Sequence, residues 1–397
     1  MRRALFLSLP LLLAIPASAH DNVGDVDRLR HEQMLVLDTH LDTPVLFERT
    51  GWNFDEWHEY GFDHSQIDLP RMEAGGLDGG FFVIYTPQGE LTPAGFQNAR
   101  DRALMRGLAI QRVVAENRDK MELAYTAADA ERIHKSGKRV VYQSIENSYP
   151  LGNDLSLLST FYRMGVRMAG PVHSKNNQLA DSTTDKPRWN GLSPLGKQWV
   201  AEMNRLGMVI DGSHSSDATF DQLLALSKTP IILSHSGSKT LYDHPRNIDD
   251  ARLRKLAKAG GVMQVNSVFL APSDNSPERS AIERRKEKWL DLTPAERRQL
   301  VADQAALDAK QPAMTGDFEL FMKSLLHAIE VMGVDHVGLG ADWDGGGGLN
   351  GMHDITALPR ITARLHQAGY SDADIEKIWS GNLLRVLRAA EKGAQKQ

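Results

Sequence analysis

The chain has 397 residues, of which 46 are Lys or Arg and 51 are Asp or Glu, giving a formal net charge of −5. This length fits one large barrel-type domain or two ordinary ones, and a hydrophobic content of 41% is typical of globular proteins. The mildly acidic balance argues against a dedicated nucleic-acid-binding protein. The sequence has no cysteine, which excludes thiol catalysis, disulfides and cysteine-ligated zinc. Any metal must be held by His, Asp and Glu.

Residues 1–19 predict a secretory signal peptide. Arg2 and Arg3 precede a short apolar run over 4–15, and a small-residue cleavage signal follows at 17–19. The run is shorter than the about 20 apolar residues of a membrane-spanning helix, and an uncleaved anchor is the alternative. We therefore expect a mature chain of 20–397 that crosses the inner membrane to the periplasm and has no membrane span after cleavage.

Short apolar runs alternate with helical patterns along the rest of the chain. Strands are predicted at 34–38, 79–85, 139–145, 166–169, 208–211, 231–234, 261–265 and 336–339. Helices are predicted at 98–118, 127–136, 194–206, 218–226 and 248–259, with a last one at 380–387 and a frayed end over 391–397. This alternation implies parallel pairing and an α/β fold, a (β/α)8 TIM-type barrel; a doubly wound open sheet is the alternative.

Two connections stand out. Residues 269–314, after the seventh predicted strand, are charged and helix-prone, and predict a long helical insertion. Such an insertion is either a functional lid or interface element or a solvated helical hairpin, and both interpretations stay open. Four consecutive glycines at 345–348 predict a flexible loop near a site, because no Gly-Lys-Ser/Thr follows to make a phosphate cradle.

Ionisable residues recur where the predicted strands end. They are His40 and Asp42 after the first strand, then Glu146, His173, His214, His235 and Asp342 after later ones. The carboxyl ends of barrel strands meet at one end of the barrel, where barrel enzymes build their active sites. His40 and Asp42 are two residues apart, so their side chains are expected on one face of the strand.

A metal site explains this collection better than separate structural roles. A single buried histidine is most often a hydrogen-bonded core residue, but several buried polar groups together carry a desolvation cost that a metal ion offsets. Histidines and carboxylates suit zinc, and a shared carboxylate suits two ions close together. Other catalytic patterns are missing: no second histidine completes a metalloprotease helix after His31-Glu32, and no Gly-x-Ser-x-Gly occurs.

Longer motifs surround the same residues. They are Asp38-Thr39-His40-Leu41-Asp42, Gln66-Ile67-Asp68-Leu69-Pro70, Ile145-Glu146-Asn147, Asp211-Gly212-Ser213-His214, Ser234-His235-Ser236, His244-Pro245-Arg246-Asn247 and the segment from Gly333 to Asp342. With these motifs the sequence resembles the membrane (renal) dipeptidase family, the M19 metallopeptidases among the amidohydrolase-like barrels. The resemblance runs from about residue 35 to 387.

The resemblance implies a dizinc site, with two zinc ions per chain. His40 and Asp42 would bind one ion, His214 and His235 the other, and Glu146 would bridge both. His173 would contact the scissile carbonyl oxygen or its oxyanion, and Asp342 would handle the proton. Arg246 would pair with the terminal carboxylate of the substrate; the alternative is a structural ion pair with Asp243 or Asp249. His244, close to Arg246, is a candidate for lining a pocket.

The implied activity is hydrolysis of dipeptides, L-Xaa-L-Xaa and L-Xaa-D-Xaa, by metal-activated hydroxide in an exported enzyme, with a homodimer expected. One segment departs from the family pattern: the residues around His173, over 170–181, keep the histidine and a later Ala-Asp but change their neighbours. This departure leaves a second hypothesis open, the same dimetal barrel acting on a non-peptide exported metabolite by amide or lactone hydrolysis or in siderophore maturation. A non-enzymatic binding protein would require missing ligands, and none is missing.

Overall fold

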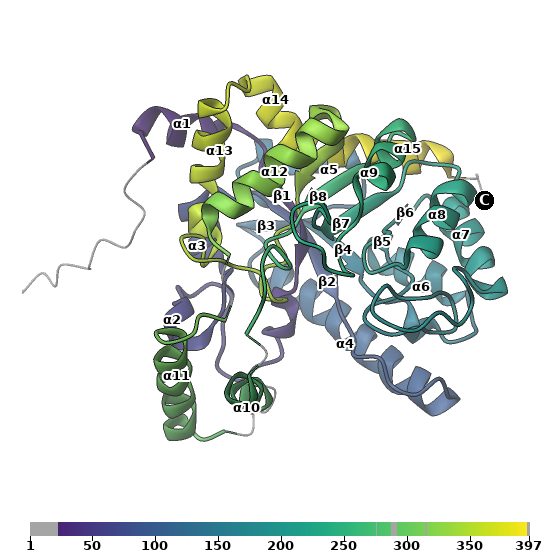
Figure 1. The fold of residues 1–397 in the computed structure, drawn as a ribbon, viewed down its shortest axis with the longest axis horizontal. Helices are drawn as coiled ribbons and strands as arrows, with labels where there is room; N and C mark the ends of the chain where they lie inside the picture. Colours follow the sequence, from purple (N-terminus) through teal and green to yellow (C-terminus); the bar gives the residue numbers. More distant parts are fainter. Residues whose placement is uncertain (1–22, 275, 287–291, 314–315, 395–397) are drawn as a thin grey trace, which may run out of the picture.

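The computed structural model describes residues 23–274, 276–286, 292–313 and 316–394. The predicted signal peptide lies outside these ranges. Figure 1 shows a central set of strands surrounded by helices, with α10, α11 and α2 projecting to one side. None of the helices within the described ranges is long and apolar enough to cross a membrane.

The strands pair in parallel and form two sheets. In the described ranges the first sheet contains β1 (Leu37–Leu41), β2 (Gly79–Ile84), β4 (Arg139–Ile145), β5 (Val166–Ala169) and β6 (Val209–Ile210) in that order, with β3 (Met121–Leu123) beside β4. The second sheet contains β7 (Ile232–Ser236), β8 (Val262–Val265) and β9 (Val337–Leu339). The α/β class with a curled parallel sheet, predicted from the alternating pattern, is confirmed.

Two single bridges join the sheets where they meet. Asp211, just after β6, bridges Ile232 at the start of β7, and Leu41 at the end of β1 bridges Trp343 beyond β9. Every residue of β1, β2 and β7 is buried, as expected for parallel strands covered on both faces. We call these two places, each joined by a single bridge, the seams between the sheets.

The predicted strands correspond to β1, β2 and β4 to β9, with two differences. β3 was not predicted, because it is three residues long and only Met121 in it is buried. β1 runs three residues later than expected, because Thr39 and His40 are polar and yet belong to a fully buried strand. The polar residues that end the apolar run therefore belong to the strand and do not mark its end.

The helices of the described ranges include a counterpart for each predicted one, and others, such as Leu157–Met164 and Leu358–Gln367, that were not predicted. They are α1 (Asp25–Gln33), α2 (Tyr60–Asp63), α3 (Leu69–Gly75), α4 (Pro93–Glu116), α5 (Ala127–Lys135), α6 (Leu157–Met164), α7 (Pro194–Leu206), α8 (Asp217–Leu226), α9 (Asp250–Lys258), α10 (Pro277–Lys286), α11 (Pro294–Asp308), α12 (Phe318–Met332), α13 (Leu358–Gln367), α14 (Asp372–Glu376) and α15 (Asn382–Gly393). The ends of α7 show why prediction works here. Ser193 caps its first turn by accepting the N–H of Gly196, Pro194 begins it, and Gly207 ends it in the left-handed conformation.

The C-terminal helix was predicted too short. α15 follows one π-helical turn, Lys377–Gly381, and continues to Gly393, whereas the prediction ended the helix at 387 and had the chain frayed from 391. Leu383, Leu387 and Ala390 pack inward on one side of this helix. Ala390 continues the apolar side of the helix beyond the leucines, on which alone the predicted end at 387 was based.

The long charged segment contains two helices, α10 and α11, which pack against each other and, through α11, against α2. Buried Arg279 on α10 holds the pair together with ion pairs to Asp274 at 3.2 Å and to Asp308 on α11 at 2.6 Å. In Figure 1 this pair lies to one side of the strands, next to α2. The helical character expected for the segment is thus present.

Candidate metal centre and substrate pocket

All of the predicted site residues lie near carboxyl ends of strands. His40 is within β1, Asp42 just after it, Glu146 just after β4, His173 beyond β5, His214 beyond β6, His235 within β7, Arg246 between β7 and α9, and Asp342 beyond β9. The structure brings all of them to one end of the curled sheet. Their convergence was expected from the order of the elements.

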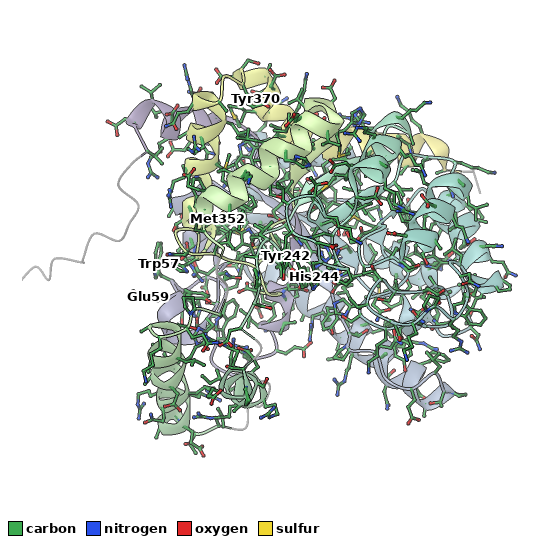
Figure 2. The ribbon with its side chains drawn as sticks, in the orientation of Figure 1. Trp57, Glu59, Tyr242, His244, Met352 and Tyr370 are labelled. Carbon is green, nitrogen blue, oxygen red and sulfur yellow. The ribbon has the colours of Figure 1, made fainter. Side chains whose placement is uncertain are left out.

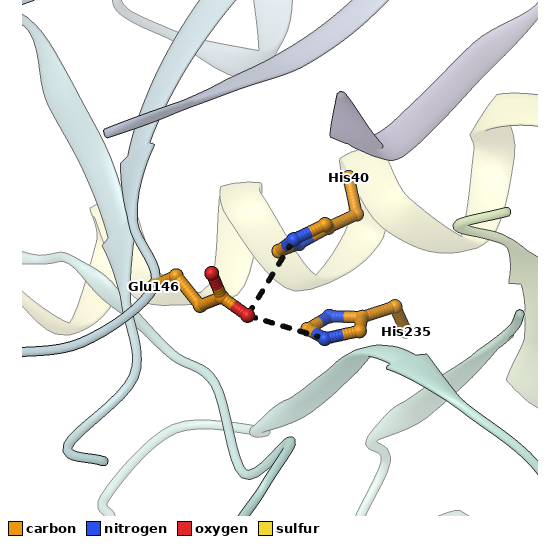
Figure 3. Close-up of side chains that lie close together, drawn as sticks. All are labelled: His40, Glu146 and His235. Carbon is orange, nitrogen blue, oxygen red and sulfur yellow. Dashed lines mark ion pairs between the residues drawn. The ribbon is translucent and has the colours of Figure 1, made fainter. Parts of the chain in front are cut away.

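Glu146 lies at the centre of the cluster. Its Oε1 is 3.0 Å from His214 Nε2, 3.5 Å from His235 Nε2 and 3.7 Å from His40 Nε2. Figure 3 shows His40 and His235 reaching this carboxylate from two different strands. His173 Nε2 also lies 3.5 Å from the same oxygen. One carboxylate oxygen therefore faces four imidazole nitrogens.

Several of these polar atoms face one another rather than hydrogen-bond partners. His214 Nε2 and His235 Nε2 are 2.8 Å apart, a distance at which one of the two nitrogens must carry the hydrogen. His40 Nε2 lies 3.3 Å from Asp42 Oδ2. Among the described residues, buried His40 Nε2 and Asp42 Oδ1 have no hydrogen-bond partner. Buried polar groups are almost always satisfied, so this arrangement points to a bound cation.

The electrostatics of the cluster support the same reading. Burial lowers the pKa of His214 and of His235 well below the usual range, so both imidazoles stay neutral. Burial also raises the pKa of Glu146 well above the usual range, and the nearby Asp42 adds to this effect. Burial alone would lower the pKa of His40, but Asp42 and the other carboxylates raise it to about 10. His214 and His235 are therefore neutral, as metal ligands must be, whereas the proton that the carboxylates hold on His40 is one that a divalent cation would displace.

Three groups of donors are close enough to hold an ion. They are His40 with Glu146 and His235, Glu146 with His173 and His214, and His40 with Asp42 and Asp342. In each group the ligand atoms lie within 4.8 Å of one another. The donors are nitrogen and oxygen throughout, which fits zinc and excludes a thiolate site. The residues present therefore fit a metal centre, and Glu146 belongs to two of the three groups.

A pocket of about 710 Å³ reaches this cluster. Its wall includes Glu146, His173, His214, Arg246 and Asp342 from the predicted set. His244 also lines it, as proposed from the sequence, and stacks on Phe269 with ring centres 4.5 Å apart. Figure 2 labels His244 beside Tyr242, whose ring is nearly parallel to it. A separate pocket of about 550 Å³ between residues 49–63 and α11 contains none of the predicted site residues.

Arg246 is buried and has no carboxylate partner among the described residues. Its guanidinium donates to the carbonyl oxygen of His235 at 2.8 Å and to Ser236 Oγ at 3.2 Å, and its Nε has no partner there. Burial lowers its pKa. Asp243 and Asp249, the alternative ion-pair partners considered from the sequence, instead pair with Lys239 and Arg252, so that alternative is wrong. The charge of Arg246 remains available to the pocket.

His214 and Asp342 hold a strained backbone. Their φ angles are 64° and 67°, in the left-handed region that residues with a side chain rarely adopt. The glycine loop makes room beside them: a Cβ on Gly345 would come within 2.1 Å of Asp42 Oδ2 and 2.3 Å of Asp342 Oδ1. The glycines therefore permit close approach to the site, in agreement with the prediction of a loop near it. Burial raises the pKa of Asp342 to about 6.

Residues that sequence reasoning missed hold the site in place. Gln66 Nε2 donates to the carbonyl oxygen of Gly347 at 2.8 Å, and Gln66 Oε1 accepts the N–H of Asp344 at 2.7 Å. Asp38 accepts the N–H groups of His40 at 2.8 Å and of Ala341 at 3.0 Å. Both residues lie in motifs that the sequence had singled out. Apart from His40, their partners are hundreds of positions away, so only the motif membership could have indicated them.

The curled parallel sheet and the buried nitrogen and oxygen donors at its carboxyl end are typical of metal-dependent hydrolases. A family model described as membrane dipeptidase (peptidase family M19) matches residues 26–397. The chain belongs to this family. The resemblance stated from the motifs is therefore confirmed.

Known proteins similar to this chain include several that are named dipeptidases. The dipeptidase tcpJ of Claviceps purpurea (strain 20.1) is 33% identical over 341 residues, covering 83% of this chain and 71% of that protein. The structure of the probable dipeptidase PvdM from Pseudomonas aeruginosa has 30% identity and a TM-score of 0.80, covering 93% of this chain and 98% of the other. The structure of dipeptidase AC, of the M19 family, has 26% identity and a TM-score of 0.73, covering 90% and 98%.

Proposed function

We propose that this protein is an exported dizinc dipeptidase that hydrolyses the peptide bond of dipeptides. The observation that carries the proposal is the convergence of four imidazole nitrogens on the Glu146 carboxylate, next to a pocket lined by Arg246, whose Nε has no hydrogen-bond partner among the described residues. Membership of the M19 family supports dipeptide hydrolysis as the reaction.

His40 and Asp42 would hold one zinc ion and His214 and His235 the other, with Glu146 shared between them. Zinc held by these residues would supply Lewis-acid chemistry: it would polarise the substrate carbonyl and lower the pKa of a water molecule to about 7. Glu146 suits the shared position because its Oε1 faces histidines from both pairs, His40 at 3.7 Å and His214 at 3.0 Å.

His173 and Asp342 would act on the substrate from the pocket wall. Burial and the nearby Arg246 lower the pKa of His173 to about 4, so its imidazole is neutral and can donate one hydrogen bond to the developing oxyanion. Asp342 lines the same pocket, beside Asp42 and Gly345, and would carry a proton to the leaving amine. Both side chains already line the pocket, so neither role requires a further charged group to enter it.

Arg246 would bind the free carboxylate of the dipeptide. A charge-assisted pair with a buried guanidinium is strong and directional, and the Nε of Arg246 has no competing partner in the described chain. A carboxylate held beside the metal ligands lies one residue beyond the scissile bond. This geometry favours dipeptides over longer peptides.

The decisive experiment is metal analysis of the purified protein together with hydrolysis of L-L and L-D dipeptides. We expect about two zinc ions per chain, cleavage of both classes of dipeptide, and loss of activity on chelation that added zinc reverses. The altered segment around His173 motivates the second candidate, hydrolysis or maturation of a non-peptide exported metabolite. A zinc-loaded protein that cleaves no dipeptide would reject the first proposal and favour the second.

We also propose that the two sheets form one closed (β/α)8 barrel of the amidohydrolase kind, with residues 269–314 as a helical insertion. The bridges from Asp211 to Ile232 and from Leu41 to Trp343 support the closure. A crystal structure with backbone hydrogen bonds across both seams would test it.

Export and assembly complete the proposal. Cleavage of residues 1–19 would deliver a chain starting at His20 to the periplasm, and N-terminal sequencing of exported protein that still begins with Met1 would overturn it. A homodimer is proposed from the family, and sedimentation of the mature chain would test it. The exposed Met105 and Leu108, one turn apart on α4, provide an apolar surface for such contact.

A further inference from the structure

His235 must present a particular ring nitrogen to the metal centre. Its Nε2 faces the cluster, 2.8 Å from His214 Nε2 and 3.5 Å from Glu146 Oε1. A neutral imidazole carries its hydrogen on one nitrogen only, and a nitrogen that carries the hydrogen cannot bind a metal ion. His235 is therefore competent only when the hydrogen is on Nδ1.

A buried chain of hydrogen bonds decides where that hydrogen lies. Nδ1 of His235 is 2.8 Å from Ser234 Oγ, and the same hydroxyl is 2.5 Å from Asp211 Oδ2. Asp211, Ser234 and His235 are all at most 3% exposed, so water does not compete for these groups. Ser234 Oγ donates its single hydroxyl hydrogen to Asp211 Oδ2, so it has no hydrogen left to donate to the ring of His235. Ser234 Oγ is then left to accept the N–H of His235 Nδ1.

The other oxygen of Asp211 fixes the direction of the chain. Asp211 Oδ1 accepts the backbone N–H groups of Ser213 and of Ser234, each at 2.9 Å. These two donors hold the carboxylate in one orientation, with Oδ2 towards the hydroxyl. β7, which carries Ser234 and His235, and the segment directly after β6, which carries Asp211, therefore set the tautomer together.

From these contacts we propose that Asp211 and Ser234 are positioning residues, which lock His235 in the tautomer with Nδ1 protonated and Nε2 free for the metal. Outer hydrogen-bond partners of metal ligands typically change metal affinity 10–100-fold when they are replaced. The inference rests on the proposed metal site but not on the identity of the substrate. His40 is placed differently, by the backbone contact of its own N–H with Asp38.

Asp211→Asn reverses the chain without changing its shape. The N–H groups of Ser213 and Ser234 require an oxygen in the Oδ1 position, so the new NH2 group faces the hydroxyl of Ser234. Ser234 must then accept from the amide and donate its hydrogen to His235 Nδ1. The ring hydrogen moves to Nε2, and the nitrogen that faces the metal centre loses its lone pair.

The test uses the metal-free and zinc-titrated protein, so it needs no substrate. Nitrogen-15 NMR of histidine-labelled, metal-free protein reports the tautomer of His235, assigned with His235→Gln, and competition with a chelator gives zinc affinity. We expect Nδ1–H in the wild type, Nε2–H in Asp211→Asn, and a 10–100-fold loss of affinity for one of the two ions. Ser234→Ala removes the relay without imposing the wrong tautomer, and should give a smaller loss.

Ser213→Ala is the matched control, because Ser213 Oγ accepts the backbone N–H of His235 at 3.2 Å and lies 3.4 Å from Ser234 Oγ, but makes no contact with the ring nitrogens of His235. It should leave the tautomer unchanged. The proposal fails if the wild type shows Nε2–H, or if Asp211→Asn keeps both the Nδ1–H tautomer and wild-type affinity. If Asp211→Asn does not fold, Ser234→Ala decides: unchanged zinc affinity and a single Nδ1–H tautomer would reject the relay. A wild-type protein that shows the expected tautomer and zinc affinity but cleaves no dipeptide would count against the proposed function instead.

Discussion

Two regions of this protein bury histidine, and they treat it in opposite ways. His31, on α1, has both ring nitrogens matched by neutral partners: Nδ1 lies 2.7 Å from Thr362 Oγ1 and Nε2 lies 3.0 Å from the carbonyl oxygen of Gly75. In the metal centre, His214 and His235 turn their Nε2 atoms towards each other, 2.8 Å apart, and towards Glu146. Both regions are fully buried, and burial lowers the pKa of the histidine in each.

The two regions differ in the hydrogen-bond partners of their histidines and not in how deeply the histidines are buried. A histidine with two satisfied nitrogens contributes to packing, and His31 adds an edge contact with Trp379 at 5.2 Å. Histidines whose nitrogens meet each other and a carboxylate are arranged for an ion. Burial and a perturbed pKa alone therefore do not identify a functional histidine; the orientation of the lone pairs does.

The largest effect is expected from Glu146→Gln, which removes the charge at the centre of one region only. Without the shared anionic ligand both ions should be lost, and dipeptidase activity with them, whereas His40→Ala should chiefly weaken one ion. Elemental analysis of the purified variants measures both. Two tightly bound ions in Glu146→Gln would contradict the shared position.

Asp342→Asn should separate chemistry from metal binding within the same region. We expect two zinc ions and an unchanged fold, with kcat lower by about 10²–10⁴ because the proton acceptor is gone. Steady-state kinetics and metal content are measured on the same preparation. Asp342 Oδ1 lies 3.9 Å from His40 Nε2, so a variant that loses zinc would show Asp342 to be a ligand instead.

The region around His31 should make the stability of the fold depend on pH. The pKa of His31 falls from 6.5 to about 4 on folding because the ring is buried. Between these pH values the unfolded chain binds a proton at His31 that the folded chain does not bind. The contribution of His31 to the free energy of unfolding is therefore intact above pH 6.5 and is lost as the pH falls towards 4. We expect a loss of about 3 kcal/mol in the free energy of unfolding. Urea unfolding of His31→Asn should show that much less dependence on pH; an identical slope would contradict the assignment.

The smallest effect is expected for Arg246→Ala, at the edge of the metal centre. Loss of a charge-assisted contact with the substrate carboxylate should cost about 1.5–3 kcal/mol, mainly in KM. A C-terminally amidated dipeptide should lose the same amount with the wild type and nothing more with the variant. Equal cleavage of free and amidated dipeptides by the wild type would show that Arg246 does not bind the carboxylate.

The sequence predicts the α/β fold and the location of the site because both depend on local patterns. Polar residues such as Glu146 and His235 follow or end strongly apolar strands, so their position at the carboxyl edge follows from strand order. The supporting contacts depend on distant partners: Gln66 accepts from Asp344, 278 positions away. β3 escaped prediction for a different reason, since only Met121 of its three residues is buried. Short elements and long-range contacts leave little periodic signal.

The narrow seams between the sheets have a consequence for how this protein can change. At one seam Asp211 holds Ser234, and at the other the N–H of Asp42 donates to the carbonyl oxygen of Trp343 at 2.9 Å. Thr39, in the same strand as His40, reaches across to the carbonyl oxygens of Ser234 and Leu339. Residues of the metal centre and their neighbours thus connect the two sheets through hydrogen bonds. Because Asp211 and Thr39 connect the sheets and also lie next to the candidate metal ligands, substitutions of either residue should lower the stability of the fold and the affinity for metal together.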